Sequence, residues 1–461
     1  MNSNCALFDT CISSNGYRSA IVQKDLNPGS VVSCEEPFAM AVFPSHSHHY
    51  CSRCLKKFEQ EKPGKRCLGG CQDTFYCSRD CQKKDFPIHK YTCKKYMKIV
   101  GTAMQQYTSA SGISRGDSFP FENFMLGRNV YIKLCLLAGI DVKEKHVDLP
   151  LPPNLEGLSE GPNIEMDEKN DHALSMIIAH SLGINNDDGV KLCGRMLRKF
   201  KYNNFGIQNS LQTVIGSGVF PRGAILNHSC DPNCILTYEG SPATQIIRII
   251  KPVTEGEELF HSYTDICQPT SVRRSRLMET YNIDCQCERC QGLGRWVDVD
   301  NALIKGTGLL SEDDEHKIES YLSTAQRISM DDIGDSTDSL KIEYENLRGA
   351  LSIQREKLGK YNLEYYKTEC LALNTAMLLG CEGVLQHAQA AVDFLSFVCN
   401  QFHPLLLLQQ MTLSELYAAY GQGAKAREMY KRLVDACKIT WGENHEFVYH
   451  YEVLLSSTSS N

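Results

Sequence analysis

Residues 227–234 read Asn-His-Ser-Cys-Asp-Pro-Asn-Cys, and the rest of the chain is organised around this stretch. A polar, turn-rich segment of this kind would by itself indicate a turn rather than a site. Here a tyrosine-bearing segment follows at residues 256–263, Gly-Glu-Glu-Leu-Phe-His-Ser-Tyr, and the spaced cysteines Cys285, Cys287 and Cys290 come after it. Three such features in one order indicate a functional site.

Length, charge and cysteine content limit the classes of protein to which this chain can belong. A chain of 461 residues exceeds what one hydrophobic core supports, so we expect several domains. The formal charge of −7 gives no general signal for nucleic-acid binding. Asp9 and Arg18 interrupt any apolar core near the start, and no apolar run is long enough to span a membrane. We therefore expect a soluble protein of the nucleus and cytoplasm, in which the clustered ones among the 22 cysteines bind metal rather than form disulfides.

The strongest local signal is a run of paired ligands over residues 51–93. The pairs are Cys51-x2-Cys54, Cys67-x3-Cys71, Cys77-x3-Cys81 and His89-x3-Cys93. Eight ligands of this type are enough for two tetrahedral zinc ions, which would supply the folding energy that this apolar-poor segment lacks. Residues 51–98 also contain 13 Lys or Arg against 5 Asp or Glu. This basic surface either attracts phosphate backbones or acidic partners, or is simply solvated.

The remaining patterns predict an α+β protein. Short β-prone runs occupy residues 1–43 and 202–265, and the missing strand–helix alternation argues against a Rossmann-type fold. Apolar residues at helical spacing fill 125–137 and 173–182, a Pro- and Gly-rich loop is expected over 148–171, and a helix with a basic exposed face over 189–201.

The last part of the chain, residues 298–461, is expected to be helical. Tyr417, Gly421, Ala426, Tyr430 and Leu433 match the later part of a tetratricopeptide repeat, with Gly421 and Ala426 allowing close helix approach. An ordinary helical bundle remains the alternative.

These motifs together resemble the SET and MYND domain protein-lysine methyltransferases. The Asn-His-Ser-Cys motif, the segment that ends at Tyr263 and the later cysteines resemble a SET domain, and Tyr76-Cys77-Ser78 with the following ligands resembles a MYND finger. The resemblance implies a split SET β-fold with this order: 1–50 N-terminal SET half, 51–93 MYND zinc finger, 94–200 helical insert, 201–265 SET catalytic core, 266–297 post-SET zinc segment, 298–461 C-terminal helical, tetratricopeptide-like domain.

The resemblance also implies S-adenosylmethionine as methyl donor, a protein lysine as acceptor and three zinc ions. Carried over, the ligand sets are Cys51, Cys54, Cys77 and Cys81; Cys67, Cys71, His89 and Cys93; and Cys230, Cys285, Cys287 and Cys290. Cys234 is the alternative fourth ligand of the last set. The other 11 of the 22 cysteines are expected to be reduced, buried small hydrophobes.

Residue roles follow by the same resemblance. Tyr263 is expected to orient the amine and the methyl group rather than act as a base, since an unperturbed tyrosine titrates near pH 10. Tyr281 lines the lysine channel. The expected contacts of the methyl donor are Tyr17, Arg18, Ser19, Asn203, Asn227, His228 and Ile283. Tyr17, Arg18 and Ser19 stand where the family usually has Gly-x-Gly, and Ile283 where relatives often have an aromatic ring.

Those two departures motivate a second hypothesis, a catalytically weak or inactive scaffold that recruits partners through the finger and the helical tail. The finger is expected to bind a proline-rich peptide or DNA in either case. We expect a monomer and no association with membranes.

Overall fold

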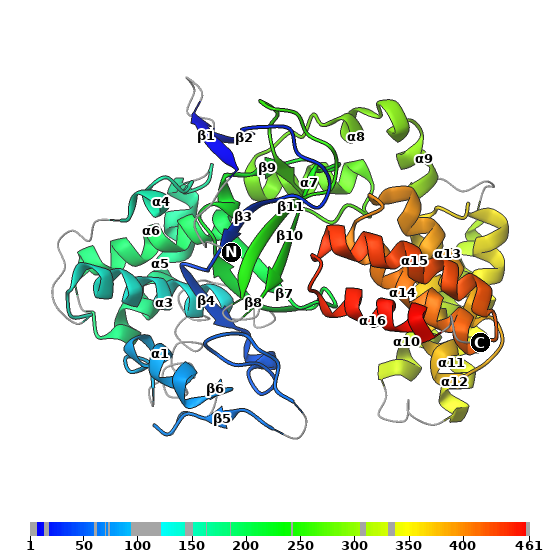
Figure 1. Ribbon diagram of the computed structural model, residues 1–461, viewed down its shortest axis with the longest axis horizontal. Helices are drawn as coiled ribbons and strands as arrows, with labels where there is room; N and C mark the ends of the chain where they lie inside the picture. Colours follow the sequence, from blue (N-terminus) through cyan, green and yellow to red (C-terminus); the bar gives the residue numbers. More distant parts are fainter. Residues whose placement is uncertain are drawn as a thin grey trace.

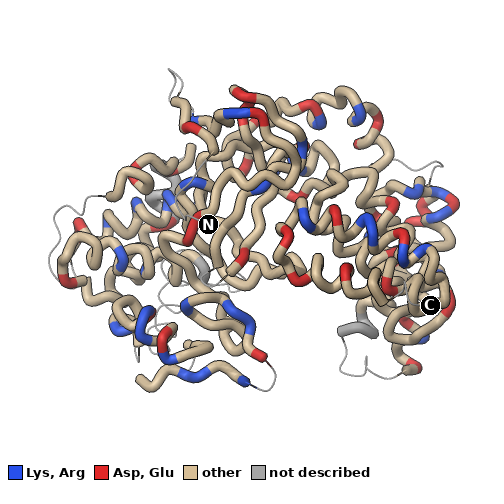
Figure 2. Tube along the Cα trace, viewed as in Figure 1, with Lys and Arg blue, Asp and Glu red and all other residues tan. Residues whose placement is uncertain are grey.

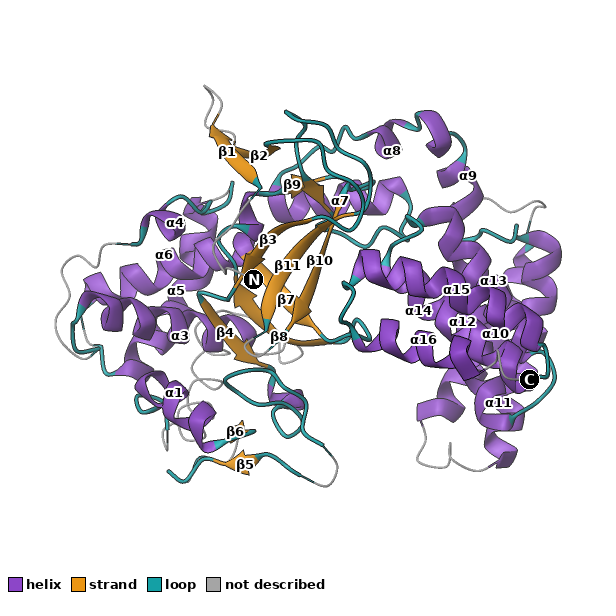
Figure 3. Cartoon of the chain, viewed as in Figure 1, coloured by secondary structure: helices purple, strands orange, loops and turns teal. Residues whose placement is uncertain are grey.

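The computed structural model describes residues 7–12, 18–59, 62–69, 71, 74–93, 121–142, 151–162, 164–184, 186–240, 243–304, 310–330 and 337–457. Small sheets lie at the centre, with a finger and a helical insert on one side and an array of helices on the other (Figures 1 and 3). The predicted α+β class is confirmed. Within the described ranges, no helix has the length and hydropathy needed to cross a membrane.

Two chain segments that are far apart in sequence build the central sheets. The first segment supplies β1 (Phe8–Ile12), β2 (Arg18–Val22), β3 (Val31–Glu35) and β4 (Ala39–Val42). The second supplies β7 (Asn204–Gln208), β8 (Val214–Val219), the 3-10 helix η2 (Gly223–Ile225), β9 (Asn227–His228), β10 (Cys234–Glu239), β11 (Thr244–Ile249) and β12 (Phe260–His261). The strand orders are β10-β11-β3, β4-β8-β7, β12-β9 and β1-β2. Because β3 and β4 pair with strands from the second segment, neither segment can complete the sheets without the other.

Close packing fixes how these sheets meet. A Cβ atom on Gly216 would lie 2.4 Å from the carbonyl oxygen of Ala41, so β8 can approach β4 only with glycine there. Between the sheets, apolar side chains from β2, β3, β10 and β11 form one buried cluster that includes Leu226, just before the Asn-His-Ser-Cys motif. The motif therefore starts from a fixed point in the core.

The insert consists of α3 (Phe121–Ala138), α4 (Pro153–Glu156), α5 (Ile164–Leu182) and α6 (Asp187–Asn203). The loop expected over 148–171 is therefore wrong at Pro153–Glu156 and from Ile164 onward. The basic exposed face expected on the helix over 189–201 is also wrong at Arg198 and Lys199, which are buried. Arg198 forms an ion pair of 3.1 Å with Glu160, and the Lys199 ammonium donates to the carbonyl oxygens of residues 156 and 158.

The finger contains β5 (Lys65–Arg66), β6 (Phe75–Tyr76) and α1 (Arg79–His89), after the 3-10 helix η1 (Pro44–His46). Helix α1 begins after Ser78, whose hydroxyl accepts a hydrogen bond from the N–H of Cys81 at 3.1 Å. This N-cap sets the direction of the helix that bears Cys81 and His89.

The C-terminal part contains α7 (Thr270–Tyr281), α8 (Glu288–Gln291), η3 (Gly294–Trp296), α9 (Val299–Ile304), α10 (Glu312–Met330), α11 (Thr337–Lys357), α12 (Leu363–Leu379), α13 (Val384–Val398), α14 (Pro404–Ala419), α15 (Gly423–Thr440) and α16 (Glu446–Ser457). From α10 onward each helix packs on the next, as in a helical repeat array. Ala426, Tyr430 and Leu433 are buried as the repeat pattern predicts. Gly421 is different: it lies in the turn before α15 with φ of +73°, and a Cβ there would meet no atom within 4 Å. It serves the turn rather than close helix packing.

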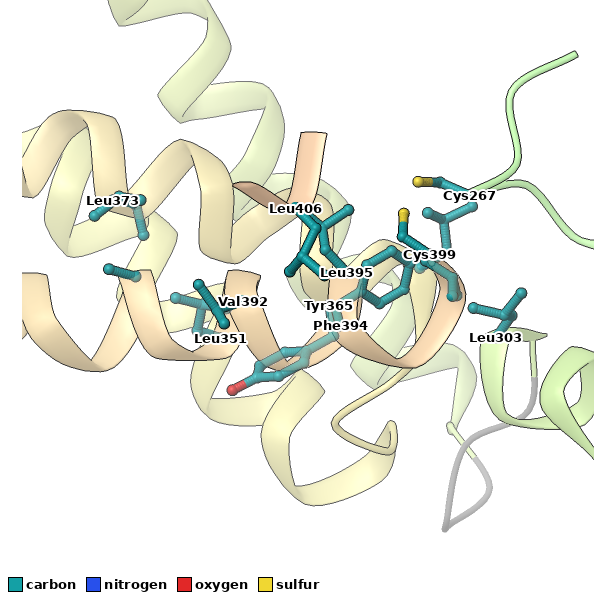
Figure 4. Close-up of a cluster of buried hydrophobic side chains, with 14 of the residues drawn as sticks. Cys267, Leu303, Leu351, Tyr365, Leu373, Val392, Phe394, Leu395, Cys399 and Leu406 are labelled. Carbon is teal, nitrogen blue, oxygen red and sulfur yellow. The ribbon is translucent and has the colours of Figure 1, made fainter. Parts of the chain in front are cut away.

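The helical array and the segment over residues 266–297 share one core. Cys267 and Trp296 belong to the same buried cluster as residues of α12 to α14. Figure 4 shows Cys267 and Cys399 meeting in this cluster from the two sides, and their thiols are in contact. The expectation of buried, reduced cysteines holds for these two residues, whereas Cys11 is exposed.

Candidate functional site

The Asn-His-Ser-Cys motif and the tyrosine-bearing segment lie side by side. Strand β9 pairs in parallel with β12, so Asn227 is opposite Phe260 and His228 is opposite His261. Asn233 holds this short pair in place: its side-chain oxygen accepts from the N–H of Phe260 at 2.8 Å, and its amide donates to the carbonyl oxygen of Glu258 at 2.9 Å. A side chain thus supplies the hydrogen bonds that a longer strand would make.

Asn227 ties three segments together. Its side-chain amide donates to the carbonyl oxygen of Arg18 at 2.6 Å and to the Glu258 carboxylate at 2.7 Å. Both amide hydrogens are therefore used within the protein, and any further hydrogen bond of this side chain must be accepted by its Oδ1 atom. Burial raises the pKa of the Glu258 carboxyl, and the hydrogen bond from Asn227 opposes this.

Tyr263 is held at both ends. Its hydroxyl donates to the carbonyl oxygen of Leu226 at 2.6 Å, and its main-chain N–H donates to Nδ1 of His228 at 2.9 Å. Its ring centroid lies 5.0 Å from that of Tyr281, whose own ring is 6.3 Å from Tyr202. Because the hydroxyl hydrogen points at Leu226, the oxygen lone pairs are available to accept a hydrogen bond.

His228 lies between Tyr263 and the cysteine cluster. Its Nε2 atom is 3.2 Å from the sulfur of Cys230, and its ring centroid is 5.3 Å from that of Tyr263. Burial lowers the pKa of the His228 imidazole to about 4, so the ring is neutral at physiological pH.

The structure brings together the same twelve ligands that the sequence pattern suggests, in three sets of four. Within each set the ligand atoms lie within 4.8 Å of one another: Cys51, Cys54, Cys77 and Cys81; Cys67, Cys71, His89 and Cys93; Cys230, Cys285, Cys287 and Cys290. Cys234, the alternative ligand, is instead buried in the core between the sheets. Four sulfur or imidazole ligands at this spacing suit tetrahedral zinc.

The surroundings of the third set fit a metal-bound thiolate cluster. Arg273 is fully buried, and its guanidinium donates to the sulfur of Cys290 at 3.7 Å and to the Thr270 hydroxyl at 2.7 Å. Although burial opposes it, the sulfur atoms of Cys230 and Cys290 raise the pKa of Arg273. A zinc ion with four thiolates carries a net negative charge, which a buried guanidinium balances. The same guanidinium also lies 3.7 Å from the Asp300 carboxylate and donates to the Gln268 carbonyl oxygen, so Asp300 and the thiolates would share the balance of its charge.

The second finger set, which consists of Cys67, Cys71, His89 and Cys93, depends on a glycine. Between Cys67 and Cys71, the N–H of Gly69 donates to the sulfur of Cys67 at 3.3 Å. A Cβ on Gly69 would lie 2.4 Å from the sulfur of Cys93, so only glycine allows this loop to close around the ligands. The Nε2 atom of His89 is 3.1 Å from the sulfur of Cys67, and burial lowers the pKa of its ring to about 4, which keeps it neutral for metal binding.

The structure describes all but one of the other expected site residues. Arg18 and Ser19 begin β2, and Tyr17 lies outside the described residues. Ile283 packs with Tyr263 and Tyr281 around Cys230. Asn203 is buried at the end of α6, where its amide donates to the carbonyl oxygens of residues 159 and 199, so that it also braces the insert.

Sequence reasoning missed several supporting residues: Tyr202, Asn233, Glu258, His261 and Arg273. Four of them carried a signal, because Asn233, Glu258 and His261 stand inside the two quoted stretches and Tyr202 directly precedes Asn203. Nothing in the sequence distinguishes Arg273 from its neighbour Arg274, since only the fold decides which of the two is buried.

Comparisons with known proteins agree with this arrangement. Residues 49–93 match the MYND finger family. The chain is 25% identical to the human histone-lysine N-methyltransferase SMYD3 over 98% of its own length and 97% of that protein. These matches confirm the resemblance to the SET and MYND domain methyltransferases. The chain is also 29% identical to the N-lysine methyltransferase SMYD2-B of Xenopus laevis, over 52% of this chain and 51% of that protein. A solved structure, the SET domain of LSMT bound to lysine and AdoHcy, is 11% identical to this chain. The match covers 98% of this chain and 88% of the LSMT chain, with a TM-score of 0.27.

The finger also has a partly apolar surface. Leu68 is 83% exposed and Phe86 is 58% exposed, and together with Arg79, Gln82 and Lys83 they line a hollow of about 340 Å³. Figure 2 shows Lys and Arg gathered along the same finger. An apolar hollow with a cationic rim is the kind of surface that binds another chain.

Proposed function

We propose that this protein is an S-adenosylmethionine-dependent protein-lysine N-methyltransferase and that Tyr263 is its catalytic residue. The observation that carries the proposal is the Tyr263 hydroxyl, bonded to the Leu226 carbonyl oxygen beside the Asn-His-Ser-Cys motif and against the Tyr281 ring. Similarity to proteins that are named as lysine methyltransferases supports the same conclusion.

The residues around the motif are suited to hold the methyl donor. Asn227 offers its side-chain oxygen to the donor's ammonium group, and the main chain of His228 and the start of β2 at Arg18 and Ser19 lie beside it. Ile283 would cover the adenine, and Asn203 would contact the donor from the insert. Tyr17 completes the expected set from outside the described residues.

Lysine methylation needs alignment and water exclusion more than acid–base chemistry. S-adenosylmethionine supplies an electrophilic methyl group when bound. The lysine amine must be neutral, whereas its reference pKa is about 10.4, and desolvation among the rings of Tyr202, Tyr263 and Tyr281 favours the neutral form. The Tyr263 oxygen accepts a hydrogen bond from that amine and directs its lone pair. Orientation of this kind contributes several kcal/mol to a displacement reaction.

The test is transfer of radiolabelled methyl from S-adenosylmethionine to histones and to proteins of a cell lysate, with zinc-loaded protein. The expected result is labelled protein that disappears with Asn227→Ala, because the motif loses both its donor contact and its bonds to Arg18 and Glu258. If the wild-type protein labels no protein at any tested donor concentration, the proposed methyltransferase activity is refuted.

The finger supports a second function, recruitment of a protein partner. The hollow between Leu68 and Phe86 suits a proline-rich peptide, and the cationic rim of Arg79 and Lys83 favours acidic flanks or a DNA backbone. In a pure scaffold this would be the whole function. Calorimetry separates the cases: micromolar binding of S-adenosylmethionine is expected of an enzyme, and its absence together with peptide binding would favour the scaffold. Binding to duplex DNA should weaken steeply with salt.

We further propose that the substrates include histone or non-histone proteins of the nucleus and cytoplasm, and that the protein acts as a monomer. The name of the human relative supports histones, and that of the frog relative a lysine in a protein. Labelling of separate nuclear and cytoplasmic extracts distinguishes the two compartments. Light scattering of the purified chain, whose mass is 51.8 kDa, tests the monomer.

A further inference from the structure

The N–H of Tyr263 has a side chain as its hydrogen-bond partner rather than a strand. Strand β12 ends at His261, two residues earlier. Beyond that point the main chain of Tyr263 donates to Nδ1 of His228 at 2.9 Å. The position of the tyrosine therefore depends on where the His228 ring is held.

This hydrogen bond fixes which nitrogen of His228 carries the proton. A backbone N–H can only donate, so Nδ1 must be the unprotonated acceptor. A neutral imidazole then has its single proton on Nε2. Nε2 lies 3.2 Å from the sulfur of Cys230, so it donates to that sulfur. Cys230 is in turn one of the four ligands of the third cysteine set.

We propose that the imidazole of His228 is a positioning residue, which connects the Cys230 thiolate to the main-chain N–H of Tyr263. Zinc in the third site makes Cys230 a thiolate, which is the stronger acceptor for Nε2–H. The ring is then fixed in the tautomer and orientation that accept from Tyr263. The catalytic meaning of this link rests on the proposed function, whereas the link itself does not.

The ring acts on two partners, and two substitutions separate them. In His228→Asn the side-chain oxygen can reach the place of Nδ1, so the acceptor for Tyr263 is kept and the donor to Cys230 is lost. In His228→Gln the side-chain amide can reach the place of Nε2, so the donor to Cys230 is kept and the acceptor for Tyr263 is lost. His261→Asn is the control for zinc binding, because His261 is near Tyr263 but outside the cysteine set.

Zinc retention is measured first, by competition with a chromogenic chelator. His228→Asn should bind its third zinc about 10- to 100-fold more weakly, the usual loss when a partner of a metal ligand is removed. His228→Gln and His261→Asn should retain zinc as the wild type does. If His228→Asn retains it equally well, the bond to Cys230 has no function and the proposal fails.

Turnover under saturating zinc is measured next. His228→Gln should lose about 10-fold or more in kcat with an unchanged KM for the donor, as expected for a displaced catalytic group. His228→Asn keeps the acceptor for Tyr263 and should therefore lose less in kcat than His228→Gln. Equal losses of zinc affinity and of kcat in both variants would show a merely structural histidine and would overturn the proposal.

A spectroscopic measurement keeps the test independent of activity. With cadmium in place of zinc in the full chain, His228→Asn should shift the cadmium resonance of the third site, and His228→Gln should instead shift the amide resonance of Tyr263. If both shifts appear but no protein is methylated, the link stands and the proposed function fails. If neither shift appears, the link is refuted whatever the activity.

Discussion

Replacement of Arg273 by methionine tests whether the third cysteine set is a charged metal centre. Methionine keeps much of the volume of this fully buried side chain and removes its charge. The guanidinium lies 3.7 Å from the sulfur of Cys290. At an effective dielectric constant of about 20, a unit pair at this distance gains roughly 4 kcal/mol, much of which offsets the cost of burying the two charges.

The net effect on zinc binding is therefore smaller than the Coulomb energy. Loss of a residue that supports a metal ligand typically weakens metal affinity about 10- to 100-fold, which corresponds to about 1.4–2.7 kcal/mol. We expect this range for the third site of Arg273→Met and no change at the two finger sites. Native mass spectrometry after graded chelator treatment measures it, because the variant should lose one zinc ion before the other two.

Arg274→Met is the matched control. Arg274 is next in the chain on the same helix, but its side chain is 43% exposed and pairs with Asp284 at the surface. It should keep the wild-type zinc content. The argument that the guanidinium balances thiolate charge would be refuted if Arg273→Met and Arg274→Met release zinc identically to the wild type.

Two further predictions concern the finger and the central sheets. Gly69→Ala should weaken only the second finger site, because the new Cβ would lie 2.4 Å from the sulfur of Cys93; mass spectrometry should show one zinc lost, and an intact site would contradict the close approach. Burial raises the pKa of Glu35 to about 7 from its ordinary value of 4.5, despite hydrogen bonds from the N–H groups of Arg222 and Gly223. The native state thus binds the proton more tightly than the unfolded state, so this group's stabilisation is present below pH 4.5 and is lost as pH rises through about 7. Glu35→Gln should gain stability relative to the wild type by about 2 kcal/mol between about pH 5 and pH 8 in denaturant titrations, whereas a constant difference would contradict the raised pKa.

The zinc ligands were predictable because residue type and spacing alone mark them in the sequence. Cysteine pairs separated by two or three residues are typical of tetrahedral metal sites rather than of scattered core cysteines. Spacing alone does not separate Cys230 from Cys234, since each is close enough in sequence, and the correct preference for Cys230 rested on the family resemblance. The choice follows from the pairing of β9 with β12, which leaves Cys230 beside the later cysteines and directs Cys234 into the core.

Burial of charge was the main feature that local pattern could not predict. The helix over 189–201 carries Arg and Lys at positions that look solvated, yet Arg198 and Lys199 face Glu160 and main-chain oxygens of the insert. Their partners come from a segment about forty residues earlier, so no periodicity in the helix itself reveals them. The roles of Arg273 and of the His228 ring were missed for the same reason.

The central claim is that Tyr263 orients a lysine for methyl transfer. Its most direct test is amino-acid analysis of protein labelled from S-adenosylmethionine, with wild-type enzyme and with Tyr263→Phe, both checked for full zinc content and for donor binding by calorimetry. We expect labelled Nε-methyllysine from the wild type, and a rate from Tyr263→Phe that is lower by about 100-fold or more with donor affinity unchanged, which corresponds to about 2.7 kcal/mol of lost transition-state stabilisation. Equal rates of methyllysine formation by the two proteins would contradict the account.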